Sequence, residues 1–363
     1  MNRRAVLIGS AAAMAAGGGL VVTSFARMGS SADYEHAMSS LRAPLGDGLT
    51  EIVRYATLAA NNHNVQPWRF DLSERAIRIR PDFSRRTPAV DPDDHHLYVS
   101  LGCATENLML AAHARGRPGE PHFDSEDEGS VVFNLGAGAQ TRSTLFDAIP
   151  LRQSTRADYD GRAAPVDDLV QLESVARPPG VDMVLITERA MLGRVRDLII
   201  DGNAAQMADR AFVAELKSWM RFSPRAALAT GDGIYSAVGG NPALPEWLGQ
   251  SMFDIAFRAK AENEKYARHL NSSAGVAVFL AEQADPAHWV QVGRACQRFA
   301  LQATALGLKH AFVNQPAEVA KVRPELAALV GMPGRRPDIV MRFGYGPALP
   351  MSPRRPVDVV IQR

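Results

Sequence analysis

The spacing of apolar residues along the chain changes several times, and these changes divide it into helices and short strands. Apolar residues recur every three or four positions along 49–60, a spacing that predicts an amphipathic helix. Along 76–79 isoleucine alternates with arginine, which is typical of a strand with one buried face. Similar patterns predict a helix at 166–175 and strands at 131–135, 181–187, 275–280 and 357–361.

Two segments of the sequence repeat one another 191 positions apart. Residues 102–116 and 293–307 share six identical residues at matching positions, and both have small side chains at helical spacing. The similarity continues in the strands at 131–138 and 339–346. Chance similarity between two alanine-rich helices is the alternative, and the matched strands argue against it. The repeat therefore predicts one fold present twice, in copies of roughly 150 residues each.

We expect an α+β fold in which two fused halves form an intramolecular pseudo-dimer, so that the protein is a monomer with a site between its halves. The first half is assigned to residues 45–140 and the second to residues 150–363. The repeat is lost along 191–270, which is helical at both ends and rich in glycine and proline at its centre. An insertion of this size is typical of a lid, a cover or an added interface.

Residues 1–26 have the features of an export signal. Arg3 and Arg4 precede an apolar run rich in alanine and glycine, and the small residues at 24–26 suit a signal peptidase. The segment resembles a twin-arginine signal, so we expect the twin-arginine machinery to export the protein to the periplasm. An uncleaved membrane anchor is the alternative, because the run approaches the length of a spanning helix. Its many glycines and alanines favour cleavage.

Charge and cysteine content exclude several partners. The formal net charge of +1 becomes −1 when the two arginines of the signal are removed. A nearly neutral protein without a polybasic block is a poor ligand for nucleic acid or an anionic membrane, so we expect no nucleic acid and no stable membrane association after cleavage. Cys103 and Cys296 lie on the two repeated helices. We interpret them as buried apolar side chains, with a disulfide between them less favoured.

A stiff loop follows the first predicted helix. Pro67 fixes its own φ and favours an extended Gln66, so the amide side chains of Asn64 and Gln66 are held in place. Fixed amides can pair with a planar heterocycle that has both donors and acceptors. A capped loop over a buried Trp68 is the structural alternative.

A second segment suits an anion. In an extended backbone, Arg152, Ser154 and Arg156 would share one face. Two guanidiniums and a hydroxyl on one face can bind a phosphate, because guanidinium pairs with oxyanions through two parallel hydrogen bonds. A solvated, charged turn is the alternative.

The acidic and histidine-rich segment at 91–96 could suggest a metal site. Consecutive side chains cannot all point at one ion, so we interpret the segment as a capped, solvated helix start and expect no metal.

Together these motifs resemble the nitroreductase-like, FMN-binding flavoprotein superfamily, in its fused, Acg-type branch. The matches are the Asn-x-Gln-Pro-Trp loop at 64–68, the Arg-x-Ser-x-Arg start at 152–156, Gly-Tyr-Gly at 344–346 and Arg-Arg-Pro at 354–356. The resemblance covers most of the chain from residue 45 onward. It implies an FMN-dependent oxidoreductase that reduces an electron-poor acceptor, such as a nitro compound or a quinone, by hydride chemistry at flavin N5.

The resemblance also implies roles for particular residues. Arg152 and Ser154, with Arg354 or Arg355 from the C-terminal segment, would hold the FMN phosphate. Arg156 would face N1 and O2 of the flavin, where a cation stabilises the reduced anion.

In the loop of the first half, Asn64 would hydrogen-bond the pyrimidine ring from its other side, with Trp68 packed beneath the loop. Gln66 of the same motif is also expected among the cofactor-binding residues. No residue of the protein is required as an acid or a nucleophile, because flavin N5 carries the chemistry.

Each motif occurs in only one half, since residues 176–182 lack the amides and the tryptophan, and nothing before Leu49 matches Arg-x-Ser-x-Arg. We therefore expect one flavin site and one degenerate site. The insertion puts turnover with nicotinamide nucleotides in doubt. Two further functions stay open: a non-enzymatic FMN-binding or sequestering protein with a lidded flavin, and a synthase that fragments the flavin.

Overall fold

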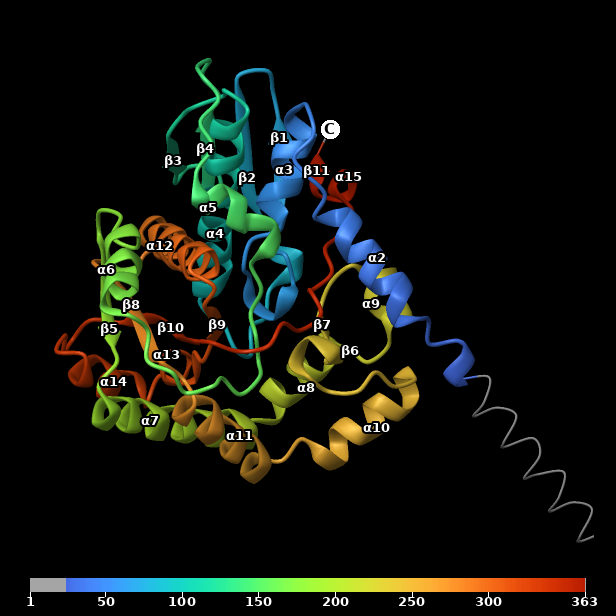
Figure 1. The fold of residues 1–363 in the computed structure, drawn as a ribbon, viewed down its shortest axis with the longest axis vertical. Helices are drawn as coiled ribbons and strands as arrows, with labels where there is room; N and C mark the ends of the chain where they lie inside the picture. Colours follow the sequence, from blue (N-terminus) through green and yellow to red (C-terminus); the bar gives the residue numbers. More distant parts are fainter. Residues whose placement is uncertain (1–23, 363) are drawn as a thin grey trace, which may run out of the picture.

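Two long helices, α4 (His95–Ala114) and α12 (Pro286–Ala305), pack against one another in the middle of the molecule (Figure 1). The structure is a computed structural model that describes residues 24–362. In it, α4 contacts one β-sheet and α12 contacts another, and apolar side chains of both helices and both sheets form the main core. Within residues 24–362, no helix combines the length and the hydropathy that crossing a membrane requires.

The two sheets have the same arrangement of strands. Their orders are β11-β1-β2-β4-β3 and β5-β8-β10-β9, so β1, β2, β4 and β3 correspond to β5, β8, β10 and β9. Within each set of four corresponding strands, neighbouring strands are antiparallel. The bounds are β1 Trp68–Leu72, β2 Ala76–Pro81, β3 Pro121–Asp124, β4 Ser130–Asn134, β5 Val181–Ile186, β8 Gly275–Ala281, β9 Lys309–Phe312 and β10 Pro337–Gly344. The predicted α+β fold with two repeated halves is confirmed.

The crossing of α4 and α12 depends on two glycines. A Cβ atom on Gly102 would lie 2.0 Å from the carbonyl oxygen of Val290, and one on Gly293 would lie 2.0 Å from that of Val99. Any larger residue at either position would force the backbones apart. The small residues that the sequence repeats are therefore the contact surface between the halves.

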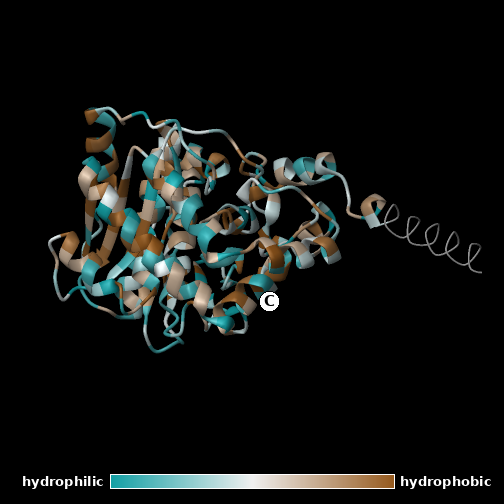
Figure 2. Cartoon of the chain, turned by 90° about the horizontal axis from the view of Figure 1, so that it is seen from below, coloured by the Kyte–Doolittle hydropathy of each residue, from teal (hydrophilic) through white to brown (hydrophobic). Residues whose placement is uncertain are grey.

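The shorter helices surround this centre. Figure 2 shows hydrophilic and hydrophobic residues interspersed along the helices of the molecule. The predicted helix at 166–175 is confirmed as α6, and the one predicted at 49–60 ends earlier, as α3. The bounds are α2 Ser31–Leu41, α3 Leu49–Thr57, α5 Thr144–Ala148, α6 Val166–Val175, α13 Gln315–Glu318, α14 Arg323–Leu329, and the 3₁₀ helices η1 Asn62–Asn64, η2 Phe83–Arg85 and η3 Ile149–Leu151.

The insertion lies between β5 and β8, where the first half has only the short turn at 73–75 between β1 and β2. It contains α7 Arg189–Ala208, α8 Arg210–Ser218, β6 Met220–Arg221, α9 Pro224–Thr230, β7 Ile234–Tyr235, η4 Ser236–Gly239, α10 Glu246–Ala256 and α11 Ala259–Asn271. Apolar residues of α7 and α11 join a second core with β8 and β10. The two ends of the insertion thus belong to the scaffold of the second half, and only its middle is available as a cover.

The C-terminal segment differs from the prediction. Instead of a strand at 357–361, the chain forms α15 (Val357–Val360) and then β11 (Ile361–Gln362). Pro356 precedes a single helical turn, as proline often does at the start of a helix. Strand β11 pairs in parallel with β1, so the end of the chain joins the sheet of the first half.

Residues 1–23 lie outside the described residues, so most of the predicted export signal has no structural counterpart here.

Candidate functional site

The loop that joins α3 to β1 has an uncommon backbone. His63, Asn64 and Gln66 have φ angles of +42°, +55° and +54°, in the region that residues other than glycine rarely adopt. The predicted extended conformation of Gln66 is therefore wrong. The backbone nitrogen of Gln66 donates to the side-chain oxygen of Asn61 over 2.9 Å, which helps to hold this conformation. Strain of this kind persists only where the surroundings fix the chain.

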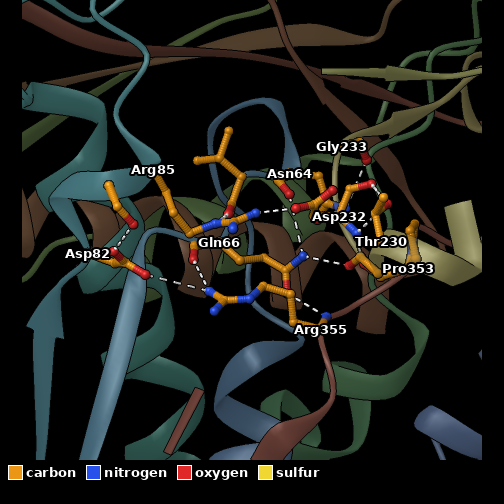
Figure 3. A network of polar contacts seen from close by, with 12 residues as sticks. Asn64, Gln66, Asp82, Arg85, Thr230, Asp232, Gly233, Pro353 and Arg355 are labelled. Carbon is orange, nitrogen blue, oxygen red and sulfur yellow. Dashed lines mark hydrogen bonds and ion pairs between the residues drawn. The ribbon is translucent and has the colours of Figure 1, made fainter. Parts of the chain in front are cut away.

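Two amide side chains of the loop connect three parts of the protein (Figure 3). Asn64 donates to the carbonyl oxygens of Gly233, in the insertion, and Pro353, in the C-terminal segment, over 3.0 and 3.1 Å. Gln66 donates to the carbonyl of Gly231 over 2.8 Å, and its oxygen accepts from the backbone of Arg355 over 2.9 Å. The loop, the insertion and the C-terminal segment are thus fixed relative to one another.

The segment at 152–156 runs beside β9. Ser154 forms an isolated parallel bridge with His310, and the backbone nitrogen of Thr155 donates to the carbonyl of His310 over 2.8 Å. In this extended segment, Arg152, Ser154 and Arg156 line one cavity. Gln153 lines the same cavity, so the shared face of the three residues stays a prediction.

That cavity has a volume of about 40 Å³ and contains four arginines. It is lined by Arg42, Arg152, Arg156, Arg354, Ala60, Asn61, Asn64, Gln153, Ser154, Ile234 and Ser352. Between residues 24 and 362, no ion pair joins any of the four guanidiniums to a carboxylate. Buried charges are normally paired, so this concentration of positive charge is suited to an anion.

Backbone carbonyls at the end of α3 hold two of these arginines. Arg354 donates to the carbonyls of Thr57, Leu58 and Ala59, over 2.5, 3.1 and 2.9 Å. Arg152 donates to the carbonyl of Leu58 over 2.8 Å, whereas its Nε atom is buried without a partner. The negative end of the helix dipole thus helps to stabilise the two cations.

Burial and mutual repulsion disfavour the charged forms of the arginines. Burial, and then the charge of Arg152, lowers the pKa of Arg42 to about 10. Burial also lowers the pKa of Arg152 to about 10, and that of Arg354 well below its usual value, with Arg42 and Arg152 contributing. A bound dianion such as phosphate would favour the charged forms of the arginines and so offset both burial and repulsion.

A second cavity, of about 440 Å³, adjoins the first, and Ala60, Asn61, Arg156 and Ile234 line both. Its walls include His63 and Ser100 of the first half. The insertion covers it with apolar side chains: Phe212, Leu216, Met220, Phe222, Leu244, Met252, Phe253 and Phe257. The combined space is positively charged at one end. At the other end it has an apolar cover from the insertion and polar side chains, such as Asn62, Gln206 and Glu318, in its other walls.

His63 lies in the wall of the larger cavity. Burial, with a contribution from the charge of Arg156, lowers its pKa to about 3. Its Nδ1 atom has no hydrogen-bond partner within the described part of the chain. The imidazole is therefore neutral at physiological pH and offers its polar atoms to a molecule in the cavity.

The structure gathers five of the eight predicted cofactor-binding residues around the smaller cavity: Asn64, Arg152, Ser154, Arg156 and Arg354. The other three lie outside both cavities. Trp68 is fully buried in the main core, Gln66 pairs with backbone groups, and Arg355 donates to the carbonyl of Gln66 and lies 3.8 Å from Asp82. These three hold the loop rather than line the space beside it.

Sequence reasoning missed Arg42, the residue that follows α2. Its guanidinium donates to the carbonyl of Ser352 over 2.9 Å, which ties α2 to the C-terminal segment. No local pattern marks this residue, because it reaches the cavity only through the packing of two segments that lie far apart in the sequence.

No family model matches the chain. It is 25% identical over 334 residues to a Mycobacterium tuberculosis protein named NAD(P)H nitroreductase Rv3131, a match that covers 88% of this chain and 92% of that protein. It is also 25% identical over 333 residues to the M. tuberculosis protein named NAD(P)H nitroreductase acg, with 86% and 95% covered.

Solved structures give weaker matches. One is the nitroreductase NfnB of Mycobacterium smegmatis, at 13% identity and a TM-score of 0.37, with 56% of this chain and 87% of that chain covered. Another is an iodotyrosine deiodinase, at 17% identity and a TM-score of 0.38, with 58% and 95% covered. Likeness at this level carries no argument about ligand or activity.

Proposed function

We propose that this chain, a member of the nitroreductase-like superfamily with Acg among its relatives, is an FMN-dependent oxidoreductase that reduces an electron-poor small molecule such as a nitro compound or a quinone. The observation that carries the proposal is a cluster of four guanidiniums without carboxylate partners, two of them buried, at one end of a cavity large enough for a planar ring system. The names of the relatives support the same class of reaction.

The residues of the site fit FMN. Arg42, Arg152 and Arg354 would bind the phosphate, and the unpartnered Nε of Arg152 is a donor available to it. Ser154 would add a hydroxyl at the same end. The ring system would occupy the larger cavity, where bound FMN would supply two-electron transfer to an acceptor.

Arg156 connects the two ends of the site, because it lines both cavities. Its guanidinium makes no hydrogen bond within residues 24–362, so its donors are available to a ligand. A cation held beside the pyrimidine edge would stabilise the negative charge that the ring acquires on reduction. Its rigid neighbours on the extended segment would keep it in place without a conformational change.

A second candidate is a non-enzymatic FMN-binding protein. It is favoured by the cover of aromatic side chains that the insertion places over the larger cavity. A closed cover would protect bound FMN and exclude an acceptor, so the two functions differ in whether the reduced cofactor can be reached.

The test begins with the flavin content of the purified full-length protein, as isolated and after reconstitution with FMN. We expect about one FMN per chain, because only one pair of motifs is present. The protein is then reduced with dithionite without oxygen, and menadione or nitrofurazone is added. Return of the oxidised flavin spectrum supports the oxidoreductase, and a spectrum that stays reduced supports the binding protein.

Two further results would contradict both candidates. Protein that retains no FMN after reconstitution would show that the proposed flavin site does not bind FMN. Loss of the flavin spectrum in air would instead support fragmentation of the cofactor.

We also propose that the protein is exported to the periplasm. Arg3, Arg4 and the apolar run after them support this proposal. The twin-arginine pathway transports folded proteins, which suits a cofactor bound before export. Replacing both arginines by lysine should leave the protein in the cytoplasmic fraction, and unchanged export of this variant would contradict the proposal.

A further inference from the structure

The start of α4 contains a buried cluster of metal-binding residues outside the proposed FMN site. Asp91, His95 and His96 are 5%, 2% and 4% exposed, and each offers a ligand atom within 4.8 Å of those of the other two. The interpretation of this segment as solvated is therefore wrong. Its capping role is confirmed, because Asp91 accepts from the backbone nitrogens of His96 and Leu97 over 2.9 and 3.0 Å.

The capping bonds explain how residues so close in sequence can converge. Asp94, with a φ of +57°, turns the chain immediately before α4. This turn places Asp91 over the first turn of α4, which contains both histidines. The rings of His95 and His96 lie with their centroids 4.7 Å apart, so both imidazoles stay near the carboxylate.

A second observation points to a ligand at this cluster. Asp338 on β10 is completely buried, and its Oδ1 lies 2.9 Å from Nε2 of His95. Despite this distance, neither atom makes a hydrogen bond of suitable geometry in the described part of the chain. Glu318 on α13 approaches His96 from the other side, with 3.6 Å between its Oε1 and Nδ1 of the imidazole.

The charges around the cluster also favour a cation. The ionisable groups around it are the carboxyls Asp91, Asp93, Glu215, Glu318 and Asp338 and the guanidiniums Arg323 and Arg336, with Asp94 already paired to Arg86. With every carboxyl ionised and both histidines neutral, these groups carry a formal charge of −3. One divalent ion would offset most of this charge, and buried carboxylates that are not balanced carry a large desolvation cost.

We propose that Asp91, His95 and His96 bind one divalent transition-metal ion of the zinc class, with Asp338 and Glu318 placed to complete its coordination. Two imidazoles and a carboxylate are a ligand set that zinc accepts, at bond lengths of about 2.0–2.2 Å. Ligand atoms bound to one ion are then at most about 4 Å apart, so a shift of under about 1 Å in the side chains would close the site.

The position of the ion would relate it to the larger cavity. His96 and Glu318 line that cavity, whereas His95 and Asp338 are buried behind it against Trp289 and β10. With Asp338 or Glu318 also coordinated, the ion would connect α4 of the first half to β10 or α13 of the second half. It would then stabilise the junction between the halves, because residues from both would bind it.

The experiment measures metal in the full-length protein after removal of any purification tag. Protein is incubated with zinc, dialysed against metal-free buffer and analysed by mass spectrometry for metal content. We expect about one zinc per chain, and less than about a tenth of that in H95Q and in H96Q, because mutating even a residue that only supports a ligand typically costs about tenfold or more in affinity. H122Q, on the exposed face of β3, is the matched control and should keep the metal.

A spectroscopic measurement on the unmodified chain keeps the test independent of whether the variants fold. Cobalt(II) added to metal-free protein should give the visible absorption bands of a protein-bound, low-coordinate ion, and zinc should displace them. Absence of these bands together with zinc-free dialysed protein would overturn the proposal. Equal metal in wild type, H95Q and H96Q would overturn it as well, because the ion would then be bound elsewhere.

Discussion

The guanidinium of Arg354 donates to the side-chain oxygen of Asn64 over 2.9 Å, although 290 positions separate the two residues. This bond joins the C-terminal segment to the loop of the first half directly beside the cavity that holds four arginines. The amide nitrogen of Asn64 donates to the carbonyl of Gly233 in the insertion. The candidate phosphate site is thus built from parts of the chain that come together only in the complete fold.

The first prediction concerns the phosphate end of the proposed FMN site. Replacing Arg152 by methionine keeps much of the side-chain volume and removes the charge. It should weaken FMN binding by about 2–3 kcal/mol, because one charge-assisted contact to phosphate is lost. The measurement is fluorescence titration of the apoprotein with FMN. Arg142→Met is the control, since Arg142 is exposed and forms its ion pair with Asp147 on the surface.

The same variant separates a binding role from a folding role. Inorganic phosphate should raise the thermal midpoint of wild-type apoprotein, because an anion relieves the repulsion among the arginines. It should raise that of Arg152→Met less. An identical response of both proteins to phosphate would place the anion site elsewhere.

The second prediction concerns the crossing of the two central helices. Gly293→Ala should destabilise the protein by about 3 kcal/mol or more, because the new methyl group meets the carbonyl of Val99 and the backbones cannot separate without breaking the packing between the halves. Gly193→Ala is the matched control: a Cβ there meets no neighbour within 4 Å, and alanine favours the helix. Urea denaturation of both variants gives the comparison, and equal stability would contradict the tight crossing.

The third prediction concerns pH. Burial lowers the pKa of His63 to about 3, so between pH 6.5 and 3 the unfolded chain binds a proton that the folded chain does not. Titration of His63 therefore lowers the free energy of unfolding as the pH falls below 6.5, by up to about 1.4 kcal/mol per pH unit, and has no effect above pH 6.5.

His63→Gln should lose less stability than wild type between pH 6.5 and 4.5, while H122Q should follow wild type. The readout is the free energy of unfolding of the apoprotein in urea at each pH. Parallel curves for wild type and His63→Gln would show that the imidazole is not held neutral by its surroundings.

The sequence predicted the repeated halves because their signal is local and occurs twice. The glycines and alanines of α4 and α12 recur at matching positions, and the same close helix crossing requires them in both copies. The segment at 152–156 also has a local signal, since alternation in an extended chain predicts that Arg152, Ser154 and Arg156 lie close together, and all three line one cavity.

The features that the sequence did not predict depend on contacts between distant segments of the chain. Gln66 takes a positive φ because Gly231 and Arg355 fix its amide, which no pattern near Pro67 could reveal. Arg42 and the final strand β11 likewise find their places only through packing against other parts of the chain. His95 and His96 are buried against Asp338 of β10 and Glu318 of α13, contacts that the sequence at the start of α4 does not encode by itself.

The last prediction concerns the cover over the larger cavity. Phe253 and Phe257 stack with their ring centroids 4.5 Å apart, both line the cavity, and neither contacts the arginine cluster. Replacing both by alanine should speed the reoxidation of reduced protein by menadione while leaving FMN content unchanged, because the change removes part of the cover without altering the phosphate site.

Deleting residues 231–245 would be a poor test of the cover, since the carbonyls of Gly231 and Gly233 hold the side chains of Gln66 and Asn64. Trp247→Ala, on the exposed side of α10, is the control for a general loosening of the insertion. If the double variant keeps its FMN and reoxidises at the rate of wild type, the cover does not control access to the cofactor.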